Sequence, residues 1–273
     1  MADLNFKFGA LILGGPKQVA GGKWDATLDE FKRSRTTNAD LTIFIRVRYI
    51  RVNPSPGKLT EQYPDSDKKP ITIQPWAHGE FEQFSAHAII GAQRFWDGVF
   101  WLRTPATYQD LNWPDETPTH RCNLHCRFKL QRVNNIQAAH YSIPVVRVQD
   151  GQPYFRANSL LYSQRVIRGL PMIPGVHGKT FWTHLHEVGH LLGLGHVGHG
   201  GHHAIPTDRS HSAYGVTQQE MRDVMGRGRI RHLWHAQPWQ KAAESFTGVH
   251  ETHWEVHMRH IAPVPLQHSA HTR

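Results

Sequence analysis

The sequence predicts a mixed α+β fold, in which one sheet is packed by two long helices and a loop-rich C-terminal region carries a further helix. Three observations support this class. Apolar residues alternate with polar ones in several short stretches, which is typical of strands, and recur three or four apart in longer ones, which is typical of helices. These stretches follow the order strand, helix, three strands, helix. With 273 residues, 39% of them hydrophobic, the chain can form one large domain or two small ones.

The first half of the chain contains the first strand and the first long helix. Apolar residues alternate with Thr and Arg over 41–52, so we expect a strand there. A stretch rich in Pro, Gly and Lys over 53–75 predicts a long surface loop. Residues 79–103 carry an apolar stripe and predict one long amphipathic helix. A second loop, rich in Pro, Thr and Asp, is expected over 104–121.

Three strands follow, over 126–131, 141–148 and 159–163. The second long helix is expected over 181–194, and Thr180 or Thr183 is available to cap its start.

Beyond this helix the chain is rich in His and Gly. The C-terminal region predicts one helix over 238–246 and another over 251–260. In the second of these, His250, His253, His257 and His260 would share a helical face, where we expect at most weak metal binding.

The composition limits the partners of the chain. A net charge of +9 and a pI near 9.8 favour an acidic polymer or an acidic substrate, although a solvated basic surface is the simpler interpretation. The basic residues form no long run and no helix-turn-helix is visible, so nucleic acid is not expected. No apolar run approaches the roughly 18 residues of a membrane span. The run 8–13 is too short for a secretory signal, so none is expected.

Cys122 and Cys126 are too few for a disulfide framework. A Cys-x3-Cys pair without a second pair is also weak support for a metal site, even with His120 and His125 beside it. A disulfide closing a tight loop and two free thiols both remain open, and so does the redox compartment.

The segment HEVGHLLGLGH, residues 186–196, carries the chemistry. Positions i and i+4 of a helix share one face, so His186 and His190 can present two imidazole nitrogens to one metal ion. Gly193 allows a sharp turn that ends the helix and returns His196 as the third ligand. Three histidines leave one coordination position open, which is typical of a catalytic zinc site. Glu187 stands beside the first ligand, where its carboxylate can reach a zinc-bound water without ligating the metal.

This segment is specific even in a chain with 22 histidines. From the residue frequencies of this chain, the short pattern HExxH would arise by chance in roughly 6% of such sequences, but the full pattern in only about 4 in 10,000. We therefore interpret it as a zinc site.

The segment resembles the zinc signature HExxHxxGxxH of the metzincin metallopeptidases in full. Met225, in the segment Asp223-Val224-Met225-Gly226, looks like the methionine turn that metzincins carry beneath the metal. The order of predicted elements also resembles the upper half of a metzincin domain. The likeness reaches from about residue 41 to 246, but only 186–196 and Met225 are specific.

The resemblance implies a domain organisation and further roles. It implies an N-terminal extension over 1–40 and a catalytic domain over 41–273, with an upper subdomain of about 41–196 and a lower one of about 197–273. Strand 159–163 would be the edge strand that pairs with an extended substrate.

Some metzincins place a tyrosine two residues after the methionine, close to the zinc, but here that position is Arg227. Tyr214 could contact the oxyanion or substrate instead, or be a surface-loop tyrosine. Replacing Met225, which we expect to be structural, should cost stability more than chemistry.

The function expected from these residues is zinc-dependent endopeptidase activity on a protein or peptide, with one catalytic Zn²⁺ ion and Glu187 as general base. Two alternatives stay open: a zinc hydrolase of a non-peptide or cell-wall amide, and a catalytically silent metzincin-like binding module. Metzincins mostly act outside the cell. We therefore favour secretion or delivery without a classical signal peptide, with a cytoplasmic enzyme as the alternative.

Further histidines lie close to the motif in the sequence. His199, His202 and His203, with Asp208, could form a second metal site, but bystander histidines are the simpler interpretation. His184 is expected to be a supporting or surface group.

Four arginines surround the methionine turn, and they could favour an acidic substrate side chain or simply be solvated: Arg222, Arg227, Arg229 and Arg231.

Overall fold

The fold is described from a computed structural model of the chain. The described residues are 7–8, 17–20, 23–29, 39–106, 120–121, 123–152, 155–168, 170–171, 180–197, 214–261 and 264–265. They belong to two compact units, each built from several chain segments. The first unit comprises Met1–Phe44, Trp96–Lys129 and Leu233–Arg273, and the second comprises Ile45–Phe95 and Leu130–His232. The division into 1–40 and 41–273 stays a prediction.

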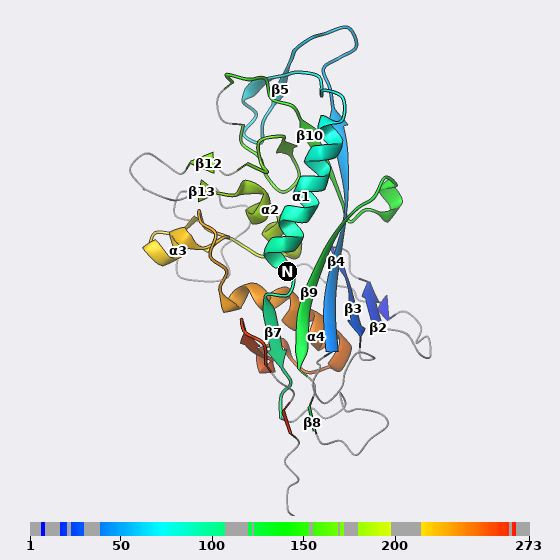
Figure 1. The fold of residues 1–273 in the computed structure, drawn as a ribbon, viewed down its shortest axis with the longest axis vertical. Helices are drawn as coiled ribbons and strands as arrows, with labels where there is room; N and C mark the ends of the chain where they lie inside the picture. Colours follow the sequence, from blue (N-terminus) through cyan, green and yellow to red (C-terminus); the bar gives the residue numbers. More distant parts are fainter. Residues whose placement is uncertain are drawn as a thin grey trace, which may run out of the picture. The chain divides into compact units, whose positions relative to one another are not determined.

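The first unit is built on a sheet with the strand order β1-β2-β3-β4-β9-β7-β14 (Figure 1). The strands are β1 Lys7–Phe8, β2 Lys17–Ala20, β3 Asp25–Asp29, β4 Ala39–Val52, β9 Leu124–Arg132, β7 Phe100–Arg103 and β14 Glu255–His257. The pairs β1–β2, β2–β3, β3–β4, β9–β7 and β7–β14 are antiparallel. The unit also holds the pair β8 His120–Arg121 and β15 Val264–Pro265, and the 3-10 helices η3 Leu233–Ala236 and η4 Glu251–His253.

Helix α4, Gln237–Thr247, packs within this first unit. Its Trp239 is fully buried, its ring centroid lies 5.6 Å from that of Phe100, and its indole N–H donates a 2.8 Å hydrogen bond to the carbonyl of Arg127. A buried indole needs such an acceptor because an unpaired N–H in the core is costly. This helix confirms the one predicted over 238–246.

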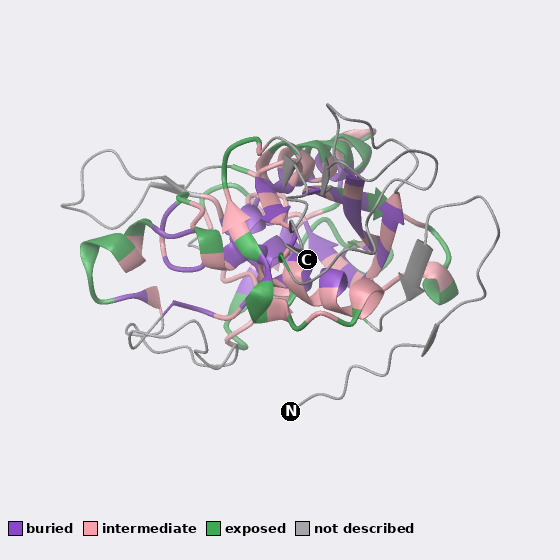
Figure 2. Ribbon diagram, turned by 90° about the horizontal axis from the view of Figure 1, so that it is seen from below, coloured by how far each residue is buried: buried purple, intermediate pink, exposed green. Residues whose placement is uncertain are grey.

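The burial pattern of strand β4 explains why the alternation of apolar residues predicted a strand. From Ile43 to Tyr49 every second side chain is buried, and the Phe44, Arg46 and Arg48 side chains between them are half-buried, the spacing that a strand with one covered face requires. In Figure 2 the ribbon is coloured by this burial. The strand predicted over 41–52 is confirmed, and β9 and β10 confirm those predicted over 126–131 and 141–148.

The second unit continues β4 with parallel strands. Val47 to Val52 pair in parallel with β10, Tyr141–Val146, whose end pairs in parallel with β11, Tyr162–Ser163. Further elements are the hairpin β5 Glu61–Pro64 and β6 Pro70–Ile73, the pair β12 Leu170–Pro171 and β13 Thr180–Phe181, the 3-10 helix η1 Ile136–Ala138, and helices α1 Glu80–Trp96, α2 Thr183–Leu192 and α3 Gln218–Arg222. With these the described residues form a mixed α+β structure with a mixed sheet and four α-helices.

Two side-chain hydrogen bonds attach α2 to its surroundings. The Tyr141 hydroxyl, on β10, donates to the Leu191 carbonyl over 3.0 Å, and His184 Nε2 lies 2.7 Å from the Ala88 carbonyl of α1. The two helices accordingly lie side by side in Figure 1, α1 in cyan and α2 in yellow-green. Helix α2 is therefore held by both the sheet and α1.

Three predicted elements were wrong in part. Residues 53–75 contain the β5–β6 hairpin rather than only a loop, because Ile71 and Ile73 pack into a core with Val146, Val148 and Phe155.

The helix predicted over 79–103 ends at Trp96. Gly98, at φ +68°, turns the chain, and the apolar residues after it belong to β7. The apolar spacing continued across this turn, so periodicity alone could not locate the helix end.

The helix predicted over 251–260 is also wrong, because η4 and β14 occupy this stretch. The four histidines expected on its face therefore do not share one. In addition, α2 begins after Trp182 without a side-chain cap, so the predicted capping by Thr180 or Thr183 is wrong.

No helix in the described part of the chain is both long and apolar enough to cross a bilayer.

The hairpin predicts a stability effect that a surface loop would not. Ile73→Ala should lower the free energy of unfolding by about 2–5 kcal/mol, because Ile73 is 1% exposed in a packed core. Leu59→Ala, at a side chain that is 84% exposed, should change it by less than about 0.5 kcal/mol. Urea unfolding of both variants measures the difference. Equal changes in the free energy of unfolding for the two variants would contradict the packing of the β5–β6 hairpin into a core.

Candidate metal centre

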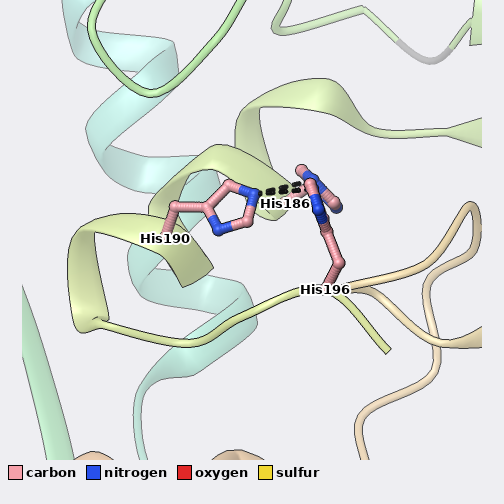
Figure 3. Close-up of side chains that lie close together, drawn as sticks. All are labelled: His186, His190 and His196. Atoms are coloured by element: carbon pink, nitrogen blue, oxygen red, sulfur yellow. Dashed lines mark hydrogen bonds between the residues drawn. The ribbon is translucent and has the colours of Figure 1, made fainter. Parts of the chain in front are cut away.

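Helix α2 carries two of the predicted ligands. Every residue of the helix except His190 is buried, and His190 is half-buried. His186 and His190 stand one turn apart, which places their rings on one face. Figure 3 shows both rings directed toward His196, which comes from the segment after the helix. The sequence-predicted trio is thus brought together.

The turn after α2 explains how His196 reaches its place. Gly193 adopts the left-handed conformation, with φ +96°, and its N–H donates to the His190 carbonyl over 2.9 Å. The N–H of Leu194 donates to the Gly189 carbonyl over 3.0 Å. These two bonds make a Schellman motif, which reverses the chain at a helix end. The predicted role of Gly193 is confirmed.

The three rings converge through their Nε2 atoms. His190 Nε2 lies 3.1 Å from His186 Nε2 and 3.0 Å from His196 Nε2, and all three ligand atoms lie within 4.8 Å of one another. A tetrahedral zinc ion with bonds of about 2.0–2.1 Å would put its nitrogens about 3.3 Å apart. Two of the separations are therefore close to those of a shared metal ion.

Backbone carbonyls determine which nitrogen carries the proton. His186 Nδ1 lies 2.8 Å from the Val224 carbonyl, and His190 Nδ1 lies 2.9 Å from the Leu194 carbonyl. A carbonyl can only accept, so each Nδ1 is the protonated donor and each Nε2 presents a lone pair. Two lone pairs 3.1 Å apart in a buried site repel each other unless a cation lies between them. The donor set therefore fits a metal ion.

The surroundings keep these imidazoles neutral. Burial, and then the neighbouring histidines, hold the pKa of His186 well below its usual value. For His190, burial followed by the charge of His196 lowers the pKa to about 4. Neutral imidazole is the form that ligates metals. The buried cluster of His186, His190 and His196 could thus hold a metal ion, and imidazole nitrogens suit several divalent transition metals.

Glu187 is buried on α2 beside the first ligand, with 6% of its surface exposed. Burial raises the pKa of its carboxyl to about 8, and the nearby Arg156 guanidinium opposes that rise. A buried carboxyl with a raised pKa can hold and release a proton near neutral pH.

The segment predicted as the methionine turn contacts one of the ligands, since the Val224 carbonyl lies 2.8 Å from His186 Nδ1. Asp223 is fully buried, and its Oδ1 accepts the Met225 N–H over 2.6 Å. Gly226 and Gly228 lie so close to α3 that a Cβ on either would sit 2.1 or 2.0 Å from a backbone carbonyl oxygen. The tight turn buries Met225 and aims the preceding carbonyl at His186.

That carbonyl belongs to Val224, a residue that the motif did not single out. Its role depends on backbone direction, for which the side chain gives no signal.

Tyr214 lies against the cluster. Its ring centroid is 4.4 Å from that of His196 and 5.7 Å from that of His186, and the Arg227 guanidinium lies 5.9 Å from it. Tyr214 is thus half-buried beside two of the histidines, and its contact with a substrate stays a prediction.

The remaining residues singled out in the sequence make other contacts in the structure. His184 is a buried residue that attaches α2 to α1, so of the two alternatives it is a supporting group and not a surface group. Arg229 lies over the Trp182 ring and Arg231 over the Phe95 ring, so both make cation–π contacts. Cys126 is buried, which raises the pKa of its thiol. Five residues lie outside the described part: Cys122, His199, His202, His203 and Asp208.

The predicted substrate-binding strand is shorter than expected. Only Tyr162 and Ser163 are in β11, and among the described strands they pair with β10 alone. Pairing of this segment with a substrate stays a prediction.

No protein-family model, no curated protein and no solved structure matches this chain. The case for a metal centre therefore depends on the geometry of its own residues.

The turn at Gly193 predicts opposite effects for two glycine substitutions. Gly193→Ala should destabilise the metal-free protein by about 1–2 kcal/mol, because a Cβ is strained at this positive φ. Gly91→Ala, within α1 and with free space around the added Cβ, should stabilise it by about 0.5–1 kcal/mol. Denaturant unfolding gives both values. A stabilising Gly193→Ala would contradict the left-handed turn.

Proposed function

We propose that this protein is a zinc-dependent endopeptidase of the metzincin type. The observation that carries the proposal is the convergence of three imidazoles at one place, two of them with lowered pKa values, with Glu187 adjacent to the first of them. Their spacing along the chain is the metzincin signature, and Met225 lies in a tight turn whose Val224 carbonyl contacts His186. Signature and geometry thus support the same centre.

His186, His190 and His196 would hold the zinc, which leaves one coordination position open. When bound there, zinc would supply Lewis acidity, polarising a substrate carbonyl and increasing the acidity of water. The Val224 and Leu194 carbonyls fix two of the rings so that their Nε2 lone pairs face inward.

Glu187 would act as the general base and then as the general acid. Its carboxylate takes a proton from the attacking water and returns it to the leaving amine. The pKa of about 8 applies to the site without a cation, and a bound cation favours the ionised form that a base requires. Tyr214, beside two ligands, can donate a hydrogen bond to the negative charge that develops on the carbonyl oxygen.

Substitution of Glu187 separates metal binding from catalysis. Glu187→Gln should keep one zinc per chain and lose turnover of a casein-like protein by at least about 10³-fold, because the amide cannot take up the proton. His190→Ala should lose both zinc and turnover. The measurements are metal analysis of protein purified without chelators and cleavage of the protein substrate.

Matched controls are available at exposed positions. Asp150→Asn and His253→Ala should each keep zinc and turnover, since both side chains are exposed and neither belongs to the cluster. Zinc without cleavage of any protein would favour a non-peptide amide, to be tested with peptidoglycan fragments, or a binding module. Absence of zinc would overturn the proposal.

A further inference from the structure

Hydrogen bonds of Asp223 close the turn that follows α3. Asp223 is fully buried, and its Oδ1 accepts the Met225 N–H over 2.6 Å. Its carbonyl accepts the N–H groups of Gly226 over 3.0 Å and of Gly228 over 2.8 Å. An aspartate that accepts the N–H two residues further on makes an Asx turn, which fixes the chain locally. The Asp223 carboxylate therefore sets the direction of the peptide group that carries the Met225 N–H.

The same peptide group contacts a predicted metal ligand on its other side. The carbonyl of Val224 and the N–H of Met225 belong to one trans peptide, so they point in opposite directions. The N–H contacts Asp223, and the carbonyl lies 2.8 Å from His186 Nδ1. Val224 is held in addition by its own N–H, which donates to the Ile230 carbonyl over 2.9 Å. One rigid planar unit thus connects a buried carboxylate to the ring of His186.

The carboxylate acts on this peptide through its charge as well as its position. A hydrogen bond to a charged acceptor is stronger than one between neutral groups. A peptide whose N–H donates strongly becomes a better acceptor at its carbonyl, because hydrogen bonds in a chain polarise one another. Many metal-bound histidines donate their second ring N–H directly to a carboxylate, which fixes the ring and its tautomer. Here a peptide group stands between the carboxylate and the ring.

We propose that Asp223 is a positioning residue for His186 and acts through the peptide group between Val224 and Met225. Its carboxylate holds this peptide in the orientation in which the Val224 carbonyl accepts the His186 Nδ1–H, so that the Nε2 lone pair faces the other two histidines. The orientation of the ring is independent of the proposed function, whereas the effect of Asp223 on zinc affinity rests on it.

NMR of the histidine side chains in metal-free protein tests the orientation without activity. In the wild type the His186 Nδ1–H should exchange slowly with water, because it is buried and hydrogen-bonded. Asp223→Ala should speed this exchange about 10-fold or more, since the acceptor loses its support. Asp223→Asn retains an acceptor without the charge, so it should keep slow exchange and move the His186 resonance upfield. The His190 Nδ1–H, on the Leu194 carbonyl, should stay unchanged in both variants.

Two controls separate positioning from a loss of stability. Ile73→Ala lowers the free energy of unfolding of the same unit from within the β5–β6 hairpin, and Asp150→Ala removes an exposed carboxylate. Both should keep the His186 signal. An unchanged signal in Asp223→Ala, or an equal loss in Ile73→Ala, would overturn the inference. If Asp223→Ala does not fold, Asp223→Asn decides, because a His186 resonance that does not move relative to that of His190 would overturn it as well.

Zinc titration against a competing chelator measures the consequence for the metal. Asp223→Ala should weaken zinc binding about 10- to 100-fold, as the loss of a group that orients a ligand typically does, and Asp223→Asn should weaken it less. Asp150→Ala and Ile73→Ala should each stay within about 3-fold of the wild type. Equal zinc affinity in Asp223→Ala and the wild type would contradict the inference. If the wild-type protein binds no zinc, the proposed function fails, and the NMR result still decides the positioning role.

Discussion

The site depends on one electrostatic constraint: imidazole lone pairs converge in a space from which water is largely excluded. With their Nδ1 protons committed to backbone carbonyls, the neutral His186 and His190 rings have no proton to place between their Nε2 atoms. A cation is the simplest group that satisfies such an arrangement. Burial adds to this, because it disfavours protonation of the rings themselves.

This constraint explains why backbone carbonyls orient the histidine side chains of the site. The Schellman turn at Gly193 both ends α2 and presents the Leu194 carbonyl to His190. The tight turn around Met225, packed on α3 through two glycines, presents the Val224 carbonyl to His186. The His186 and His190 rings are therefore each oriented by a chain reversal, a rigid support that a flexible side-chain partner would not supply.

The elements that orient the ligands all belong to one of the two units of the chain. Helix α2, the turn at Gly193 and the tight turn around Met225 lie within the second unit. The same unit holds the β5–β6 hairpin, whose turn is organised by Asp65 and paired with Arg156 through Asp67. The geometry of the three histidines therefore does not depend on how the two units are arranged.

The sequence by itself determined the candidate metal-binding trio, the turn at Gly193 and the strands β4, β9 and β10, because each depends on spacing along a helix or a strand. It could not locate the end of α1, since the apolar spacing continued past Gly98 into a strand. It also missed the hairpin, whose Ile71 and Ile73 are buried by residues more than 70 positions away. Tertiary structure alone decided the role of Val224. This role depends on which backbone carbonyl lies opposite the His186 ring, and local pattern carries no record of that pairing.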